Sequence, residues 1–247
     1  MTALRRSSLL FLRRCLAATQ AFSRIRIPGS LAAWAQLLPA DTADSARHWP
    51  GVGLLAGMAG CVVFALVSLP LPPGPLSPLV AAVAASMAMA LVAGVRAEES
   101  LAHCTGPAGL MLVLAAKLAL LALLGLHSGV GLLTALLGAA ALSRLFALLV
   151  AWSLPPRRPQ ADHPLLRRAD RGALLAACLW CVPPLVLMLL AGGAKFLLLP
   201  LVLGTIAFAV LRHRFQRRGG VELDDVGFAQ QVCEVAIYLG AAFGLPR

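Results

Sequence analysis

Charged residues are scarce in this sequence. They make up 13% of the 247 residues, whereas 60% are apolar, and the mean hydropathy is +0.86. A soluble domain with a wet surface needs far more polar side chains than this composition supplies. No polar stretch is long enough to fold alone, which excludes a membrane anchor joined to a soluble domain. We therefore expect an all-α, polytopic helical membrane protein in which residues 1–247 form one domain.

Signatures of several other protein classes are also missing. The six cysteines are scattered and imply no disulfide framework. Cys178 and Cys181 have the spacing of a metal-binding pair, but they lie in an apolar stretch without a second pair or a nearby histidine, which favours packing. The glycine pairs lack the flanking strand and the Lys-Ser/Thr context of a phosphate-binding loop. The cysteines and glycines therefore indicate no functional site.

Residues 1–50 look like a secretory signal peptide only superficially. The apolar run that precedes Arg13 and Arg14 is short, and residues 17–19 form a poor cleavage site. We expect this segment to stay uncleaved and to lie on the cytoplasmic membrane surface, ahead of a transmembrane bundle over residues 51–245.

Proline, glycine and charge clusters divide the rest of the chain into apolar stretches that are long enough to span a bilayer with some tilt. They predict about seven transmembrane helices, at residues 51–69, 76–95, 107–126, 129–154, 172–191, 196–211 and 226–245.

Charge gathers in every second connection between these stretches. The N-terminus and the connections at 96–106, 155–171 and 212–225 carry it, whereas those at 70–75, 127–128 and 192–195 carry almost none. Because Lys and Arg stay on the cytoplasmic side, we expect an inner-membrane protein with the N-terminus and the charged loops in the cytoplasm. The formal charge of +11 then reflects topology and attraction to membrane lipid, not nucleic-acid binding.

Two pairs of adjacent carboxylates lie where an apolar stretch meets the expected cytoplasmic surface. They are Glu98–Glu99 and Asp224–Asp225, and oxygen ligands of this kind suit a hard cation such as Mg²⁺. For Asp224 or Asp225, capping of the last helix is an equally good interpretation. His103 follows the first pair and is a candidate for acid–base work or metal binding, or a solvated loop histidine. The other loop acids fit solvated charge interleaved with arginine: Asp41, Asp44, Asp162 and Asp170.

Three ionisable residues lie inside the apolar stretches. Lys117, Arg144 and Glu234 are each about ten residues from the cytoplasmic end, a depth on the order of 15 Å. A lone charge at that depth is costly, so each should face the bundle interior, with Glu234 paired to Lys117 or Arg144. Either a structural tie or a wet substrate cavity would explain them. Gln230, Gln231 and Glu234 share one helix face, which indicates a polar interior.

The stretch RRGGVELDDVGFAQQVCE, residues 217–234, carries a resemblance to a known family. It resembles the C-terminal signature of the adenosylcobinamide-GDP ribazoletransferases, also called cobalamin 5′-phosphate synthases. Without a gap, the matching residues are Gly219, Gly220, Val221, Asp224, Gly227, Gln230, Gln231 and Glu234. Residues 21–28 (AFSRIRIP) and 46–57 (ARHWPGVGLLAG) are similar to the family's N-terminal part.

The middle of the chain departs from the family pattern. The best counterpart of the central aspartate motif is GVRAEESLAHCTG, residues 94–106, where Glu98 is kept. Glu99 and His103 stand where the family has Asp, and Ala97 stands where it has His. The cytoplasmic segment that follows in the family is largely deleted, because Pro107 enters the next apolar stretch almost at once.

The resemblance implies a Mg²⁺-dependent transfer in cobalamin nucleotide-loop assembly. Adenosylcobinamide-GDP and α-ribazole, or its phosphate, would give adenosylcobalamin, or its phosphate, and GMP. The catalytic candidates are Asp224, Glu234 and Glu99. Substrate-binding candidates are Arg144, Arg217, Arg218, Gln230 and Gln231, although topology alone also accounts for Arg217 and Arg218. The metal candidates are Glu98, Glu99, Asp224 and Asp225.

Two alternatives come from other functional classes. The substituted central motif fits a catalytically impaired relative that binds a corrinoid or acts as a membrane scaffold, and a small transporter is a third reading. The expected partners are membrane lipid and the corrinoid and ribazole substrates. A homo-oligomer or an assembly with other membrane proteins of the cobalamin pathway is also open.

Overall fold

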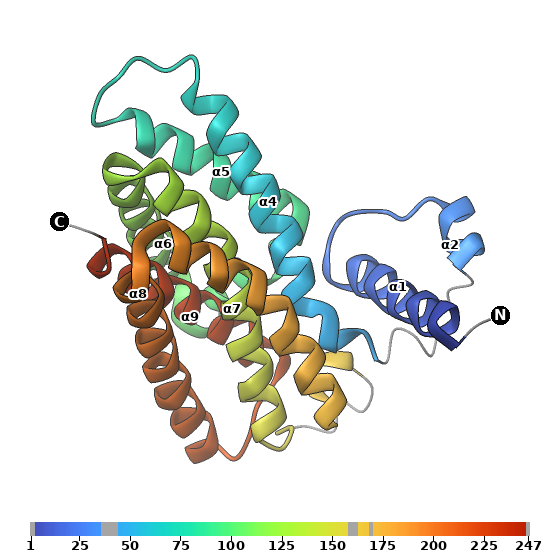
Figure 1. The fold of residues 1–247 in the computed structure, drawn as a ribbon. Coiled ribbons are helices and arrows are strands. Elements are labelled where there is room, and N and C mark those ends of the chain that lie inside the picture. Colours follow the sequence, from blue (N-terminus) through green and yellow to red (C-terminus); the bar gives the residue numbers. More distant parts are fainter. Residues whose placement is uncertain (1–2, 36–43, 158–162, 168–169, 246–247) are drawn as a thin grey trace.

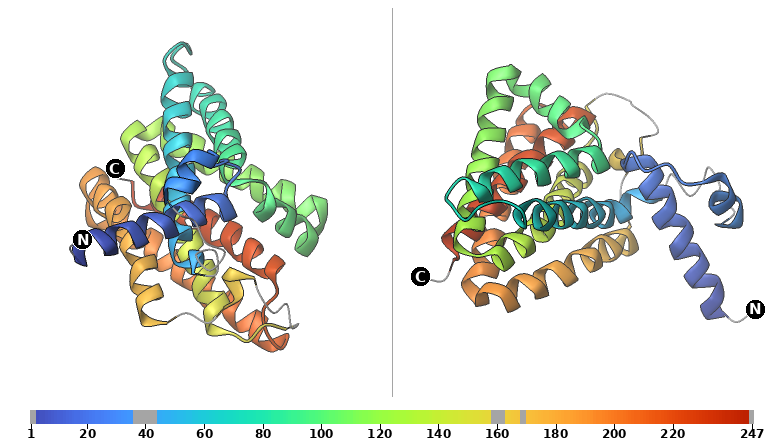
Figure 2. Two further views of the ribbon diagram at one scale, coloured as in Figure 1. Left: turned by 90° about the vertical axis from the view of Figure 1, so that its right-hand side faces the viewer. Right: turned by 90° about the horizontal axis from the view of Figure 1, so that it is seen from above.

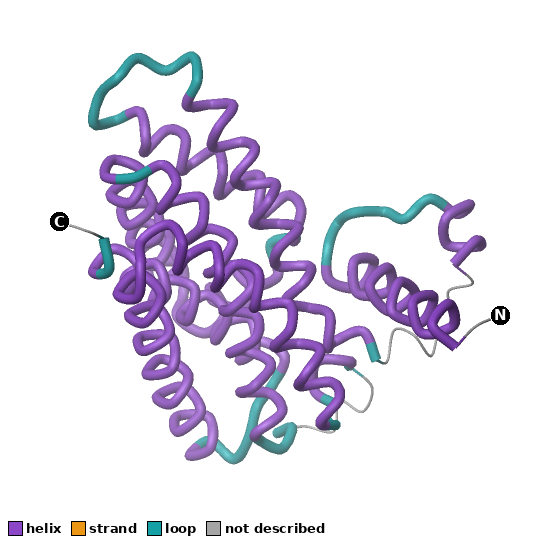
Figure 3. Tube along the Cα trace, in the orientation of Figure 1, coloured by secondary structure: helices purple, strands orange, loops and turns teal. Residues whose placement is uncertain are grey.

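The computed structural model describes residues 3–35, 44–157, 163–167 and 170–245. Nearly all of this part of the chain is helical, and its only β-type pairing is an isolated bridge between Pro156 and Val221 (Figure 3). The helices are α1 (Ala3–Phe22), α2 (Gly29–Ala35), η1 (Ser45–His48), α4 (Trp49–Ser68), α5 (Ser77–Ala93), α6 (Arg96–His127), α7 (Gly129–Ser153), η2 (Pro164–Leu166), α8 (Arg171–Arg217) and α9 (Leu223–Phe243). Asp41 and Asp162 lie outside the described residues.

The prediction of an all-helical membrane protein is confirmed. Within the described residues, five helical segments are long and apolar enough to cross a membrane: Ser45–Ser68, α6, α7, α8 and α9, while α5 is apolar but shorter. Large apolar side chains on the outer faces of the helices are exposed, as lipid contact requires; examples are Val62, Met87, Leu112 and Leu190.

All seven predicted stretches lie in helices, although two helices contain more than one unit. At about 1.5 Å per residue, the 47 residues of α8 would extend about 70 Å, more than twice the apolar thickness of a bilayer. Gly193, with a φ of 73°, interrupts the helical backbone, and Figure 1 shows α8 turning back on itself as a hairpin. In α6, Gly106 has a φ of 75° and separates a short charged segment from the apolar part that Pro107 begins. The number of membrane crossings stays a prediction.

Helix α7 forms the centre of the bundle. Eighty-three percent of its apolar window is buried, and it packs against α4, α6, α8 and α9. Its small side chains permit this: a Cβ on Gly53 of α4 would lie 2.2 Å from the carbonyl oxygen of Ala140. Close backbone approach at small residues is the usual way in which helices associate in lipid.

The ends of the helices that carry charge meet at one end of the bundle, here called the charged end. The bridge between Pro156 and Val221 joins the end of α7 to the start of α9, and the Arg24 amide donates to the Val92 carbonyl near the end of α5. Helices α1 and α2 lie beside this end, outside the main bundle, and α1 contacts η1 and α4 (Figures 1 and 2).

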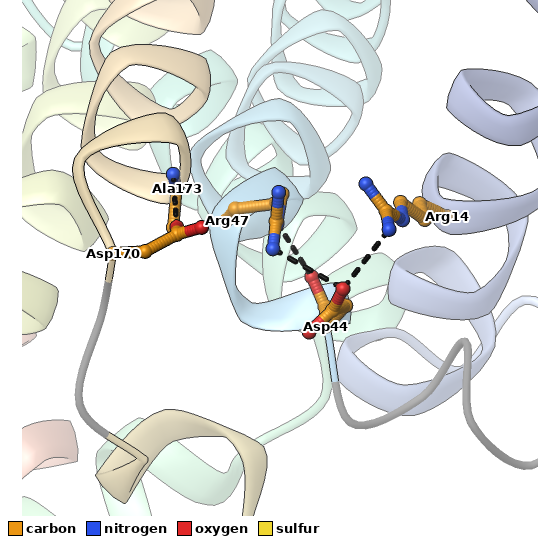
Figure 4. A network of polar contacts seen from close by, with 5 residues as sticks. All are labelled: Arg14, Asp44, Arg47, Asp170 and Ala173. Atoms are coloured by element: carbon orange, nitrogen blue, oxygen red, sulfur yellow. Dashed lines mark hydrogen bonds and ion pairs between the residues drawn. The ribbon is translucent and has the colours of Figure 1, made fainter. Parts of the chain in front are cut away.

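Polar contacts join α1 to η1, and η1 is held to the bundle by the indole of Trp180 in α8, whose Nε1 donates to His48 Nδ1 at 3.0 Å. Asp44 accepts from Arg14 of α1 at 3.0 Å and from Arg47 at 3.2 Å (Figure 4). Nearby, the Asp170 carboxylate accepts from the amide of Ala173 at 2.7 Å. Asp170 thus caps the N-terminus of α8, where the amides of the first turn have no partner within the helix. The N-terminal segment is therefore held where it can contribute to a site at the charged end.

Candidate functional site

A cavity of about 700 Å³ opens at the charged end of the bundle. Its walls come from the end of α1 and the segment after it, from the start of α4, from α5, α6, α7 and α9, and from the residues around η2. Polar side chains that line it are Gln20, Ser23, Arg24, Ser86, Arg96, Glu98, Glu99, Ser100, His103, Lys117, Arg144, His163, Asp224, Gln230, Gln231 and Glu234.

Close packing of α6 against α9 brings carboxylates from two distant segments of the sequence to this cavity. A Cβ on Gly227 would lie 2.5 Å from Ser100 Oγ and 3.3 Å from the Cα of Ala97, so the two helices touch only because position 227 lacks a side chain. The segments are more than a hundred residues apart in sequence. Their contact places Glu98, Glu99 and Asp224 on one cavity.

Asp224 lies at the open part of the cavity, here called the mouth. Its Oδ1 accepts from Ser100 Oγ at 3.3 Å, and its Oδ2 is 3.4 Å from His103 Nδ1. The side chains of His103 and Asp224 are 72% and 55% exposed, and Glu99 is also exposed. Water can therefore reach the carboxylates of the mouth.

The predicted intramembrane ion pair is confirmed at the buried part of the cavity, here called the deep end. Lys117 Nζ is 2.8 Å from Glu234 Oε1, and the hydroxyl of Tyr238 donates to the same oxygen at 3.1 Å. Arg144 is 4% exposed, and its Nη1 donates to the carbonyl of Ala140 at 2.6 Å. Lys117, not Arg144, is thus the direct partner of Glu234.

The deep end also joins α6 to α9 through an amide. Gln231 Nε2 donates to Glu98 Oε1 at 3.0 Å, and Gln231 is 1% exposed. Gln230 lines the same cavity and is 5% exposed. The shared face that the sequence predicted for Gln230, Gln231 and Glu234 is therefore a cavity wall.

Three candidates lie away from the cavity lining. Asp225 belongs to a capping box: its Oδ2 accepts from the Glu222 amide at 2.9 Å, while the Glu222 side chain accepts from the Asp225 amide. Arg217 and Arg218 are exposed at the end of α8 and beyond it. Capping explains Asp225 without a metal, and the two arginines have no contact with the cavity.

Comparison with known proteins shows that the chain is similar to members of one enzyme family. A model of the cobalamin-5-phosphate synthase family matches residues 103–242. A protein named adenosylcobinamide-GDP ribazoletransferase from Polaromonas sp. is 34% identical over 276 aligned residues, covering 95% of this chain and 98% of the relative. A relative of the same name from Polaromonas naphthalenivorans is 33% identical, with 96% of this chain and all of the relative covered. The chain belongs to the adenosylcobinamide-GDP ribazoletransferase family.

Family membership covers the C-terminal signature better than the central one. The match to the family begins at His103, so Asp224 and Glu234 lie inside it and Glu98 and Glu99 lie outside it. The alignment with the first relative runs over 276 residues, more than the 247 of this chain, so that ribazoletransferase contains residues that this chain lacks. No solved structure matches this member of the family.

The carboxylates of this ribazoletransferase family member do not form a ready-made metal cluster. In the described part of the chain, no three His, Cys, Asp or Glu side chains lie close enough to hold an ion. Glu98 lies at the deep end, where one of its oxygens accepts from Gln231 and the other has no hydrogen-bond partner among the described residues. Glu99 and Asp224 are the exposed carboxylates of the cavity, and since Mg²⁺ commonly uses one or two carboxylates together with substrate phosphates, they fit an ion that arrives with its substrate.

Sequence reasoning missed part of the cavity wall. Arg24 lies in the AFSRIRIP segment, whose resemblance to the family was the one available signal for it. His163 precedes η2, and its Nδ1 accepts from the Leu165 amide at 3.4 Å. Burial, and secondarily the positive charge of Arg96, lower the pKa of His163 below its usual value. No sequence signal pointed to His163, since its place depends on how the loop between α7 and α8 folds back.

Proposed function

We propose that this protein joins adenosylcobinamide-GDP to α-ribazole, or to its phosphate, and releases GMP. The observation that carries the proposal is the convergence of the α6 and α9 carboxylates on one cavity at the charged end. The relatives named adenosylcobinamide-GDP ribazoletransferase support the choice of substrates. Closing of the nucleotide loop is the reaction that follows from both.

The transfer is a displacement at phosphorus. The ribazole hydroxyl oxygen forms a bond to the phosphorus that carries cobinamide, and the bond from this phosphorus to the bridging oxygen breaks. GMP leaves with that oxygen, and the hydroxyl proton passes to a base. We assign the base to Asp224, whose carboxylate lies at the mouth and is kept in place by Ser100 Oγ. Glu99 is the second candidate at the mouth.

The other carboxylates have separate roles in this proposal. Glu234 is held by Lys117 and Tyr238, so it shapes the deep end and is not free to take a proton. Glu99 and Asp224 at the mouth would hold a magnesium ion, which when bound would neutralise charge on the substrate diphosphate, while Glu98 belongs to the deep end. Asp225 is left out of this set, because its carboxylate serves the capping box.

The proposal is tested by GMP release from adenosylcobinamide-GDP with purified full-length protein. Asp224→Asn keeps the size of the side chain but removes its basicity, and we expect release to fall at least about a hundredfold. Asp170→Asn is the matched control, because Asp170 lies outside the cavity and asparagine also caps helices well. Turnover by Asp224→Asn equal to that of the control would refute the assignment.

A second candidate function has support in the structure. The described residues lack a cluster of three metal-binding side chains, and the resemblance found in the sequence implies that Glu99 and His103 stand where the family has aspartate. A protein that binds the corrinoid without turnover fits these facts. Binding of cobinamide with no GMP release, at any concentration of added Mg²⁺, would favour it over the transferase.

We further propose that the charged end faces the cytoplasm from the inner membrane. The alternation of basic connections with connections that carry almost no charge supports this orientation. A reporter enzyme that is active only outside the cytoplasm should be active when fused after residue 247 and silent when fused at the connection 155–171. The reverse result would invert the proposed topology.

A further inference from the structure

Four buried polar atoms on cavity-lining residues have no hydrogen-bond partner among the described residues. They come from four different helices: Ser86 Oγ of α5, Glu98 Oε2 of α6, Arg144 Nε of α7 and Gln231 Oε1 of α9. Gln231 and Arg144 are 1% and 4% exposed. Buried polar groups are rarely left unpaired, because each loses its hydration without compensation. The shared location indicates a ligand that supplies the missing partners.

The chemical roles of these atoms define what the ligand must offer. Gln231 uses its Nε2 to donate to Glu98 Oε1 at 3.0 Å, so the atom that remains is its carbonyl oxygen. Gln231 Oε1 and Glu98 Oε2 are therefore both acceptors, whereas Arg144 Nε is a donor. A ligand that satisfies these three atoms carries two N–H donors and one acceptor. The fourth atom, Ser86 Oγ, sets no further requirement, because a hydroxyl can donate or accept.

The charge balance of the deep end argues against an anion. Lys117 contacts Glu234 at 2.8 Å, and Arg144 interacts with both Glu234 and Glu98, so two cations already face two carboxylates. A phosphate placed here would lose its water beside the Glu98 carboxylate, with no uncompensated cation to replace it. An uncharged group that is rich in hydrogen bonds meets no such penalty.

We propose that Glu98, Arg144 and Gln231 form a subsite, here called the amide subsite, for an uncharged group with two N–H donors beside a carbonyl acceptor. Guanine presents this pattern on its N1, N2 and O6 edge, and so does a primary carboxamide. The inference rests on the proposed function, because the nucleotide of the substrate carries guanine and its corrinoid carries carboxamides. The subsite would orient one of these groups while the diphosphate lies toward the mouth.

The test measures affinities for the full-length protein in nanodiscs by calorimetry, without divalent metal, so that lost metal binding does not contribute. The probes are GMP, IMP and cobinamide. Glu98→Gln replaces an acceptor by a donor, and Gln231→Leu removes the second acceptor. Each should weaken the binding of the resident group by roughly tenfold to a hundredfold, as expected for hydrogen bonds that involve a buried charge or amide. Asp170→Asn should bind every probe like the wild type.

The probes distinguish the two sources of the group. If guanine occupies the subsite, GMP binding falls in both variants, and IMP, which lacks the N2 amine, binds the wild type more weakly than GMP. If a carboxamide occupies it, cobinamide binding falls and GMP binding does not. Binding of GMP and cobinamide within twofold of the wild type in both variants would overturn the proposal, as would failure of both probes to bind the wild type.

Failure of this inference can be separated from failure of the transferase proposal. GMP release by the wild type together with unchanged affinities in both variants would remove the amide subsite alone. Weakened binding in the variants without any GMP release by the wild type would keep the subsite and remove the reaction. The unfolding temperature of each variant shows whether it is folded, and either variant alone is sufficient for the test.

Discussion

The two parts of one cavity are built in opposite ways. At the deep end, the paired side chains of Lys117 and Glu234 are 7% and 3% exposed and lie 2.8 Å apart. At the mouth, the side chains of His103 and Asp224 are 72% and 55% exposed, and their closest atoms are 3.4 Å apart. The fold therefore fixes the deep end before a ligand arrives, whereas the mouth keeps carboxylates that water screens.

The difference assigns a separate task to each part. Charges inside the bundle interact strongly, and each must be compensated within the protein. Exposed charges interact weakly with each other and remain available to a charged ligand. Recognition of uncharged groups is thus expected at the deep end, and contact with phosphate, metal or protons at the mouth.

Removal of one partner from the deep pair should have the largest effect on stability. Lys117→Met leaves the Glu234 carboxylate buried with the Tyr238 hydroxyl as its only hydrogen-bond donor among the described residues, and we expect a loss of about 3–5 kcal/mol in the free energy of unfolding. The double variant Lys117→Met/Glu234→Met should recover most of this loss, because no unpaired charge remains. Reversible unfolding in detergent, followed by circular dichroism, measures both.

An ion pair outside the cavity provides the control for this prediction. Arg157 and Glu222 are in contact at 2.7 Å, but their side chains are 39% and 21% exposed. Arg157→Met should therefore cost less than about 1 kcal/mol. If Lys117→Met costs no more than Arg157→Met, the deep end is wet, and the contrast between the two parts of the cavity is wrong.

A change at the contact of α6 with α9 should affect the two parts together, by a smaller amount. Gly227→Ala puts a Cβ 2.5 Å from Ser100 Oγ, so the helices must separate, at a cost of about 1–3 kcal/mol. GMP release should also fall, because Glu98 belongs to α6 and Asp224 to α9, so separation of the helices moves the two carboxylates apart. Gly129→Ala is the control, since no atom lies within 4 Å of its added Cβ. Equal stability of the two variants would show that the contact is loose.

The sequence was sufficient for the fold because lipid imposes simple rules. Each apolar stretch between charge clusters became a helix, and the hairpin in α8 forms where the weakly charged connection at 192–195 was expected. What it could not provide was the rotation of each helix. Counting residues placed Lys117 and Arg144 at one depth, but only the packed bundle decides that Lys117 reaches Glu234.

The same limit applies at the mouth. Asp224 and Asp225 are adjacent in sequence, but neighbours on a helix point about 100° apart, so one lines the cavity and the other caps α9. The place of Arg24 and His163 depends on loops that fold back over the charged end, and such long-range packing leaves no periodic pattern.

The smallest effect is expected from His103, which tests whether the mouth is as loosely held as its exposure indicates. His103→Gln removes a 3.4 Å contact with Asp224 that contributes at most about 1 kcal/mol when the imidazole is charged, and less as salt rises. We expect little change in unfolding, and GMP release within about threefold of the wild type, by the same assay as for Asp224→Asn. A hundredfold loss would mean that His103 takes part in the chemistry. The mouth would then be a preorganised site like the deep end, because exposed side chains can catalyse at that level only when the protein holds them in position.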